Sequence, residues 1–554
     1  MSIAKPGGRS SGLVPSKLVC LILLAVSTAA QQAVQLPRTE PILDYIRRTW
    51  TVLTRSNRTL AKAAVDPKFH PAPDGRWPVY IPRAADLGEI ETQIRQTMPL
   101  ADFRSIELRV LPPEPAQIRD QGLLYLPKPY VVPGGRFNEM YGWDSYFIQI
   151  GLLHDHFDAL AKDMADNFRY EIHNYGKILN ANRTYYTTRS QPPFLTEMLL
   201  GVYERTHDRK WLADSVSAIE EYYRYWTNEP HLTRETGLSR YFDLSEGPAP
   251  EVRASERDSQ GQTHYDLARQ YFRTHPTPDY DLGQYYDSKR DQLTSLFYKG
   301  DRSMRESGFD PSDRFGPFSV DIIHYNPVCL NSLLFMLESQ TADIMRILNR
   351  VEEEAVWRKR SAERAGLVNR LMWDEEDGLY YDYEFVHQRR RKYPFLTTFY
   401  PLWAGIATRD QAARVVRNLP LFERSGGLQT STNRSGEQWD APFGWAPLEL
   451  LAVQGLRRYG YNQEADRIST EFLSLVIEQY RKSGTIVEKY DVVRRSAEVG
   501  NEIRFGYRSN EAGFGWTNAV FTALLDALPP RAKGGLRLLN GLRSGKSRLH
   551  HDSR

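Results

Sequence analysis

Apolar residues recur three and four positions apart over much of this chain, in segments joined by short turns. This spacing places them on one face of an α-helix. The first such segment runs from Pro41 to Leu60, with apolar side chains at helical spacing from Ile42 to Leu53. Helices are predicted over residues 41–60, 145–153, 158–175, 193–205, 209–226, 263–273, 283–298, 328–353, 354–372, 446–459, 462–482 and 511–528.

These helices come in pairs. Two amphipathic helices are joined by a short turn, and a longer loop rich in Gly, Pro and Arg follows. A helical hairpin cannot bury the apolar faces of both helices by itself, so stacking hairpins in a ring is a natural way to complete the core. The pattern therefore predicts an all-α toroid. The proline-rich segment from Pro67 to Pro82 is expected to break regular structure.

The composition is that of a soluble globular protein with enough material for a large core. Hydrophobic residues make up 41% of the 554 residues, charged residues make up 25%, and the mean hydropathy is −0.55. The formal net charge is only +3, so no overall field would recruit nucleic acid or an anionic membrane. A small neutral partner is expected, and a monomer is favoured.

The N-terminus has the pattern of a secretory signal. Lys5, Arg9 and Lys17 precede an apolar run over residues 18–26, and small residues follow at 27–30. This run is too short to span a bilayer. Residues 1–30 are therefore predicted to be a signal peptide and the protein to be secreted or periplasmic, with no integral membrane segment in the mature chain.

The predicted mature chain divides into a domain over residues 31–528 and a basic, flexible tail over residues 529–554. The sequence has two cysteines, and removal of the signal would leave Cys329 alone, so no internal disulfide is expected. Cys329 lies in an apolar stretch, where a buried, inert thiol is expected.

Residues 133–147 combine glycines, aromatics and opposed charges. Pro133 and two glycines predict a tight turn and a loop after it. The following segment mixes Phe137, Tyr141 and Trp143 with charged residues. Flat apolar faces beside bidentate polar groups are what a sugar requires. The alternative is a buried aromatic cluster with a structural Arg–Asp pair.

Residues 133–147 resemble the first signature of trehalases, glycoside hydrolase family 37, and residues 438–447 resemble the second. The similarity extends from about residue 36 to residue 528. Residues 177–182 and 237–241 resemble the neutral branch of the family. The resemblance implies an (α/α)6 toroid with its site in the loops at one end. It also implies hydrolysis of the disaccharide α,α-trehalose to two glucose molecules, with inversion and without a cofactor.

Glycoside hydrolysis needs two carboxyl groups that flank the bond. Asp310 follows a glycine turn between Phe309 and Pro311, a setting that can desolvate the acid and favour its protonated form. Residues 305–312 resemble the family segment that carries the general acid, which implies this role for Asp310. Residues 485–491 resemble the segment with the general base, which implies that role for Glu488. An inverting pair is expected about 6.5–9.5 Å apart.

The resemblance also implies a set of substrate-binding residues: Arg136, Phe137, Tyr141, Trp143, Asp144, Asn180, Arg189, Gln191, Glu251, Gly308, Gln438, Trp439 and Asp440. Trp445 and Trp516 are expected to pack in the core. Many family members carry an arginine where this chain has Ala249, so hydrolysis of another α-glucoside stays open. A non-catalytic sugar-binding protein is a further alternative. The sequence does not decide whether Glu502 or Glu511 matches the family's supporting glutamate.

An acidic run over residues 374–378 resembles a calcium loop, but it lacks the EF-hand spacing and the closing glutamate. A solvated turn is the simpler interpretation. The sequence therefore predicts no metal site.

Overall fold

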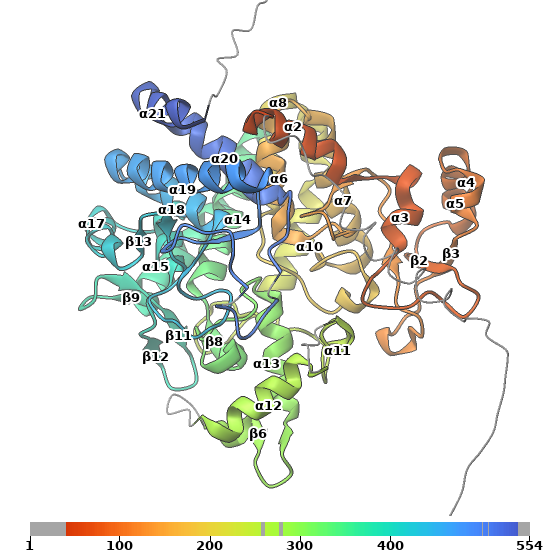
Figure 1. The fold of residues 1–554 in the computed structure, drawn as a ribbon, viewed down its shortest axis with the longest axis horizontal. Coiled ribbons are helices and arrows are strands. Elements are labelled where there is room, and N and C mark those ends of the chain that lie inside the picture. The colour runs from red at the N-terminus through yellow and green to blue at the C-terminus, as the bar shows by residue number, and fades with distance from the viewer. Residues whose placement is uncertain (1–39, 256–260, 276–280, 501, 508, 541–554) are drawn as a thin grey trace, which may run out of the picture.

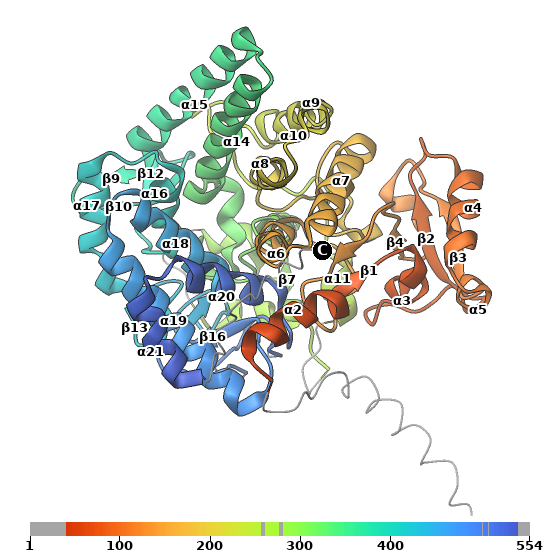
Figure 2. The same cartoon turned by 90° about the horizontal axis from the view of Figure 1, so that it is seen from above.

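The computed structural model describes residues 40–255, 261–275, 281–500, 502–507 and 509–540. Its centre is a ring of inner helices, seen end-on in Figure 2. Neighbouring inner helices pack against one another around the ring, and the last packs on the first. Most of them bury residues on nearly every side, as expected for helices inside a core. The inner helices are α6 (Gly142–His154), α8 (Leu195–Thr206), α14 (Val328–Ile347), α16 (Tyr400–Ala404), α18 (Ala446–Arg458) and α20 (Gly515–Ala527).

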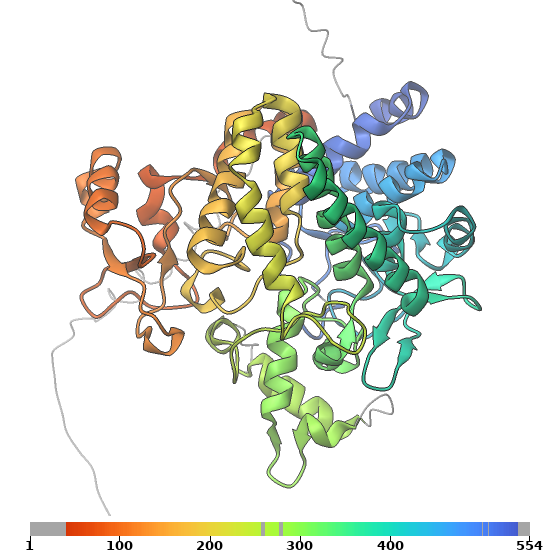
Figure 3. The same ribbon diagram turned by 180° about the vertical axis from the view of Figure 1, so that it is seen from behind.

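Amphipathic helices form an outer layer around this ring (Figures 1 and 2). Each buries one face, as α19 does with Ile468, Phe472 and Leu475. The outer helices are α2 (Ile42–Leu53), α7 (Asp158–Tyr175), α10 (Val216–Thr227), α15 (Val351–Met372), α17 (Arg409–Arg417) and α19 (Asn462–Ser483). The predicted all-α toroid of paired helices is confirmed. Figure 3 shows α14 and α15 as a green antiparallel pair from behind.

Several predicted helices have other bounds. The helix predicted over 41–60 ends at Leu53, and the one predicted over 209–226 is divided into α9 (Arg209–Ala213) and α10. Residues 283–298 instead contain a hairpin of β6 (Tyr286–Asp287) and β7 (Gln292–Leu293). Helix α13 (Ser295–Glu306) follows, because the hydroxyl of Thr294 accepts a hydrogen bond from the backbone of Phe297 and caps it.

A small lobe beside the ring contains a parallel sheet that the sequence does not predict (orange in Figure 1). Strand β2 (Trp77–Ile81) lies between β3 (Ile106–Val110) and β4 (Leu123–Leu124). Helices α3 (Leu60–Ala64), α4 (Leu87–Thr97) and α5 (Leu100–Phe103) accompany the sheet. The expectation that residues 67–82 hold no regular structure is wrong, because β2 accommodates Pro78 and still pairs on both sides.

The chain between α10 and α14 forms a second lobe, drawn in green at the bottom of Figure 1. It contains α11 (Pro250–Ser255), α12 (His264–Thr274), the β6–β7 hairpin and part of α13. Its aromatic core includes Tyr265, Phe272 and Phe297. A 3-10 segment, η5 (Pro317–His324), packs against α13.

Short antiparallel pairs tie the loops together. They are β1 (Thr54–Arg55) with β5 (Tyr130–Val131), β11 (Asp382–Glu384) with β8 (Tyr325–Asn326) and β12 (Arg389–Arg391), β9 (Trp373–Asp374) with β10 (Leu379–Tyr380), β13 (Glu423–Arg424) with β14 (Gly427–Leu428), and β15 (Phe443–Trp445) with β16 (Lys489–Asp491). The remaining 3-10 turns are η1 (Asn57–Thr59), η2 (Pro115–Gln117), η3 (Thr184–Tyr186), η4 (Leu282–Gln284), η6 (Leu396–Phe399) and η7 (Leu419–Leu421).

Past the ring, the chain continues as helix α21 (Pro530–Asn540), which packs on α19 where the sequence predicts a flexible tail. Residues 541–554 lie outside the described residues, as does the predicted signal over 1–30. Among the helices that the structure describes, none is both long and apolar enough to cross a membrane. Cys329 is buried, as predicted, and burial raises the pKa of its thiol.

Candidate active site

A cavity of about 810 Å³ opens at the end of the ring where α6 and α20 begin. Its volume falls within the range of about 300–1,000 Å³ that is common for ligand pockets. The loops before the inner helices form its wall, together with residues 66–68 of the small lobe and Gln262, His264 and Leu267 at the start of the second lobe. Segments from most of the chain length therefore meet at one cavity.

Most of the predicted site residues line this cavity. They are Arg136, Phe137, Tyr141, Trp143, Asp144, Asn180, Arg189, Gln191, Glu251, Gly308, Asp310, Trp439 and Glu488. Both predicted catalytic carboxyl groups are among them, although they come from loops that are distant in sequence. The two carboxyl groups that a two-carboxyl mechanism needs therefore line one cavity.

Gln438 and Asp440 do not belong to the lining. The Gln438 amide instead donates to the backbone oxygen of Asp310 and accepts from Lys489 Nζ at 3.2 Å. Asp440 is fully buried, and its carboxylate accepts from the Asp313 backbone at 2.9 Å and from the Tyr393 hydroxyl at 2.8 Å. These two residues support the loop that carries Asp310 from behind the cavity wall.

The first signature folds in a way that the sequence does not predict. Helix α6 begins at Gly142, so Trp143 and Asp144 stand in its first turn and not in a loop. The Gln191 amide oxygen accepts from the Trp143 backbone at 3.0 Å and satisfies one of the unpaired N–H groups of this helix end. Gly134 is needed because a Cβ there would lie 2.9 Å from the Phe514 ring.

Tryptophans form one wall of the cavity. Trp439 stacks on Trp445 with ring centres 3.7 Å apart and an interplanar angle of 6°. Trp143 and Trp516 meet at 5.8 Å in an edge-to-face contact. Trp516 lines the cavity, contrary to the expectation that it only packs in the core, whereas Trp445 supports Trp439 from behind. Such flat faces suit the apolar side of a sugar ring.

Glu488 is placed by β-pairing between distant motifs. Strand β16 pairs with β15, which aligns Lys489 with Trp445 and leaves Glu488 at the strand end. The Glu488 carboxylate is almost fully buried, and it accepts from the Tyr507 hydroxyl at 2.8 Å and from Lys489 Nζ at 3.2 Å. Burial, together with the nearby Glu488 and Asp310 charges, raises the pKa of Tyr507 well above its usual value, so the phenol stays a donor.

Asp310 stands at the cavity surface, with 32% of its side chain exposed. Arg305 Nη1 lies 3.7 Å from its carboxylate. Gly308 has a φ of +77°, and a Cβ there would come within 3.0 Å of the Trp143 indole, so glycine meets both requirements of this turn. Asp310 is thus more exposed than its apolar sequence neighbours predict, and a cation lies beside it.

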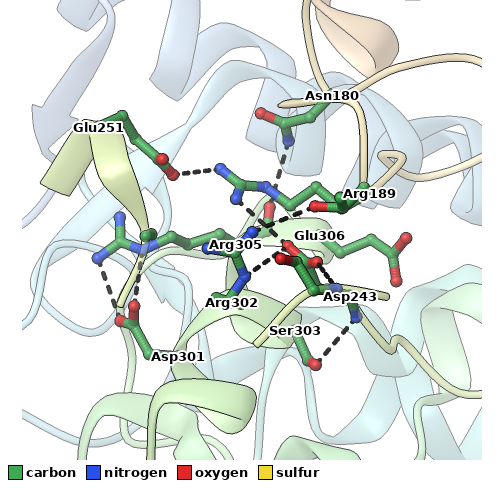
Figure 4. A network of polar contacts seen from close by, with 12 residues as sticks. Asn180, Arg189, Asp243, Glu251, Asp301, Arg302, Ser303, Arg305 and Glu306 are labelled. Carbon is green, nitrogen blue, oxygen red and sulfur yellow. Dashed lines mark hydrogen bonds and ion pairs between the residues drawn. The ribbon is translucent and has the colours of Figure 1, made fainter. Parts of the chain in front are cut away.

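Burial and neighbouring charges shift the pKa values of carboxyl groups in the cavity wall. Burial, and then the negative charge of Glu488, raises the pKa of Asp144 well above its usual value. Burial would also raise the pKa of Glu251, but the Arg189 and Arg305 charges hold it below its usual value. Figure 4 shows Arg189 between Glu251, at 2.5 Å, and Asp243, at 3.5 Å.

Sequence reasoning missed several residues around the cavity. Tyr507, Asp66 and Lys68 line it from loops with no recognised motif, and His264 lines it from the first residue of α12. Arg305 also lines the cavity. It begins the segment 305–312 that carries Asp310, so this segment could have identified it as a site residue.

The structure separates the two undecided glutamates. Arg136 lies 3.2 Å from the Glu511 carboxylate, and the Glu511 backbone oxygen accepts from Glu488 at 3.0 Å. Glu502 instead pairs with the exposed Arg494. Glu511 is therefore the glutamate that supports the candidate site.

Asp374, Glu376 and Asp377 bring three carboxylates close enough to hold a metal ion. Lys392 Nζ lies 3.6, 3.3 and 3.1 Å from them. The Lys392 ammonium group thus offsets part of the negative charge of this cluster.

Comparisons with known proteins agree with this architecture. The model of the trehalase family matches residues 92–529. The cytosolic neutral trehalases of Emericella nidulans and Neurospora crassa are each 36% identical to this chain, over 88% of it and 72% and 73% of their own lengths. That of Saccharomyces cerevisiae is 37% identical over 74% of this chain, which spans 58% of that relative.

A solved structure of neutral trehalase from Saccharomyces cerevisiae superposes with a TM-score of 0.75 at 33% identity. The match covers 90% of this chain and 96% of that one.

The predicted secretory signal and the secreted or periplasmic location are contradicted by these relatives, which are named cytosolic neutral trehalases. The prediction rested on a few basic residues before a short apolar run. Such a run is a weak signal, because it also occurs in chains that are not exported.

The family match extends over most of the chain, the relatives exceed 30% identity across most of its length, and the toroid agrees with a solved member. The motifs of both signatures meet at one cavity of this fold. The chain belongs to the trehalase family.

Proposed function

We propose that Asp310 and Glu488 carry out the chemistry of this chain by inversion, with Asp310 as general acid and Glu488 as general base. The activity itself follows from the family: the chain is a glycosidase that hydrolyses α,α-trehalose to two molecules of glucose. The observation that carries the residue assignment is that both carboxyl groups line the same cavity.

The surroundings of the two groups suit different roles. Glu488 accepts hydrogen bonds from Tyr507 and Lys489, which fix the position of its carboxylate at the cavity. Asp310 is partly exposed at the cavity, where it can deliver a proton to the bridging oxygen. In this mechanism Glu488 deprotonates a water that attacks the anomeric carbon from the opposite face.

The binding residues divide into flat and polar walls. Trp143, Trp439 and Phe137 offer ring faces, whereas Arg189, held by Glu251, presents a fixed guanidinium fork to vicinal hydroxyls. Because this chain has Ala249 where many family members carry an arginine, hydrolysis of another α-glucoside is the alternative. Parallel assays with trehalose and maltose would show which of the two the enzyme prefers.

Isosteric variants test the assignment. Asp310→Asn and Glu488→Gln should each lower kcat by at least about 10²-fold, the usual contribution of a general acid or base. Glu376→Gln, at an exposed carboxylate outside the cavity lining, is the matched control and should retain full activity. Release of glucose from trehalose is the measurement. Near-wild-type turnover in either site variant would remove that residue from the mechanism.

A further inference from the structure

The small lobe contributes a lysine to the wall of the candidate active site. Lys68 is partly buried and lines the same cavity as Asp310 and Glu488. Its ammonium group donates to the Tyr186 hydroxyl at 3.4 Å and lies 5.6 Å from the centre of the Tyr185 ring. A cation from outside the ring of helices therefore reaches the site.

The loop that carries Lys68 is fixed by its own hydrogen bonds. The Asp66 carboxylate accepts from the backbone of Lys68 at 3.0 Å and from the buried Tyr185 hydroxyl at 2.8 Å. The backbone of Phe69 donates to the backbone oxygen of Asp66 at 3.2 Å. The loop is thus ordered before a ligand binds, which lowers the entropic cost of binding.

The Lys68 side chain keeps its charge and has donors to spare. Burial would lower the pKa of its ammonium group, but neighbouring groups raise this pKa above its usual value. These neighbours are Tyr186, Glu139, Asp66 and Glu251. An ammonium group has three N–H donors. Among the residues that the structure describes, only the Tyr186 hydroxyl accepts a hydrogen bond from it, so donors remain for a ligand in the cavity.

The Tyr186 ring places Lys68 close to an arginine of the predicted sugar site. The Lys68 ammonium lies 5.8 Å from the centre of this ring, and the Arg189 guanidinium lies 4.8 Å from it. Both cations therefore belong to the same part of the cavity. Arginine offers a rigid planar fork, whereas lysine offers a compact charge on a flexible stem, so the two side chains can hold different hydroxyl groups of one sugar ring.

We propose that Lys68 donates hydrogen bonds to hydroxyl groups of the glucose unit that Arg189 holds, so that the small lobe supplies part of the trehalose-binding site. This inference rests on the proposed use of the cavity for the reaction. A hydrogen bond from a charged donor is stronger than one between neutral groups. These hydroxyls do not react, so the contact should serve binding and not the chemical step.

Steady-state kinetics with trehalose tests the proposal. Lys68→Met keeps the long apolar stem but removes the charge and the donors. Its KM should rise at least about tenfold, whereas kcat should change by less than about threefold. Lys68→Gln keeps a neutral donor on a shorter side chain, and its KM should rise at least about threefold. This second variant keeps the test decisive if Lys68→Met folds poorly.

Lys62→Met is the matched control. Lys62 belongs to α3 of the same lobe, is exposed and lies outside the cavity lining, so its variant should have the wild-type KM. Calorimetric titration of trehalose into Glu488→Gln, with and without Lys68→Met, measures affinity without turnover. The added substitution should again weaken binding at least about tenfold.

A raised KM at nearly constant kcat in the Lys68 variants, with an unchanged control, supports the proposal. A wild-type KM in both variants overturns it, as does a fall in kcat at constant KM. A lower melting temperature with a wild-type KM would assign Lys68 a structural role and also overturns it. Failure of the proposed catalytic roles is a separate result, because Asp310→Asn or Glu488→Gln would then keep turnover whatever Lys68 does.

Discussion

At the residue scale, the buried carboxyl group of Asp144 is expected to lower the stability of the folded protein at neutral pH. Burial and the neighbouring carboxylates raise its pKa well above the ordinary value of an aspartate. In the unfolded chain the same carboxyl ionises near pH 4. Above that pH the unfolded state gains from ionisation while the folded state does not, so stability is lost as the pH rises toward the folded pKa.

Asp144→Asn removes this penalty and should therefore raise the melting temperature at pH 7 by roughly 2 °C or more. The gain should disappear as the pH falls to about 4, where both states carry a neutral side chain. Thermal unfolding of the variant and the wild type between pH 4 and pH 8 measures it. A difference that does not depend on pH would show that Asp144 is ionised in the folded protein.

At the element scale, one arginine joins the small lobe to the toroid. Arg183 is fully buried and donates to the backbone oxygens of Ala63, Ala64 and Val65 at 2.9 Å. Its Nε also donates to Glu139 at 2.7 Å. The next residue of the lobe, Asp66, lines the cavity, so this anchor also sets the cavity rim.

Arg183→Met should lower the free energy of unfolding by about 3–5 kcal/mol, because it leaves Glu139 buried without its cation. The exposed pair of Arg346 and Asp343 supplies the control, since Arg346→Met should cost less than about 1 kcal/mol. Urea unfolding compares the two. Equal costs would mean that the lobe is held by its other contacts.

The elements also show what the sequence can predict. Helix α7 has the predicted bounds, because its apolar spacing is regular and Gly176 ends it in a left-handed conformation. Strand β2 was missed, since Pro78 removes a backbone donor and disfavours a strand locally. Tyr507 was missed because its place beside Glu488 depends on tertiary packing of a loop. The motifs identify residues of the signatures but not their buried partners, such as Asp243 beside Arg189.

At the scale of the whole molecule, the toroid depends on closure between its first and last inner helices. Helix α20 packs on α6 at Gly151, where a Cβ would lie 2.9 Å from the Ala519 side chain and 2.5 Å from the Trp50 ring. Outer helix α2, which carries Trp50, covers the same junction. A single methyl group at this point therefore tests whether the ring has room to adjust.

Gly151→Ala should lower the free energy of unfolding by about 1–3 kcal/mol, the usual cost of overpacking. Gly366→Ala is the control within α15, where a Cβ meets nothing within 4 Å, and it should stabilise the protein by about 0.4–1 kcal/mol. Opposite signs in the two variants are expected from chemical denaturation. A stabilising Gly151→Ala would contradict tight closure.

The stereochemistry of hydrolysis tests the central claim most directly. Proton NMR of wild-type enzyme with α,α-trehalose can read the anomers of glucose before they equilibrate. Inversion by Asp310 and Glu488 predicts equal initial amounts of α- and β-glucose, because the leaving glucose keeps its configuration and the attacked one inverts. If both products appear first as α-glucose, the enzyme retains configuration, and the proposed roles of the two carboxyl groups are wrong.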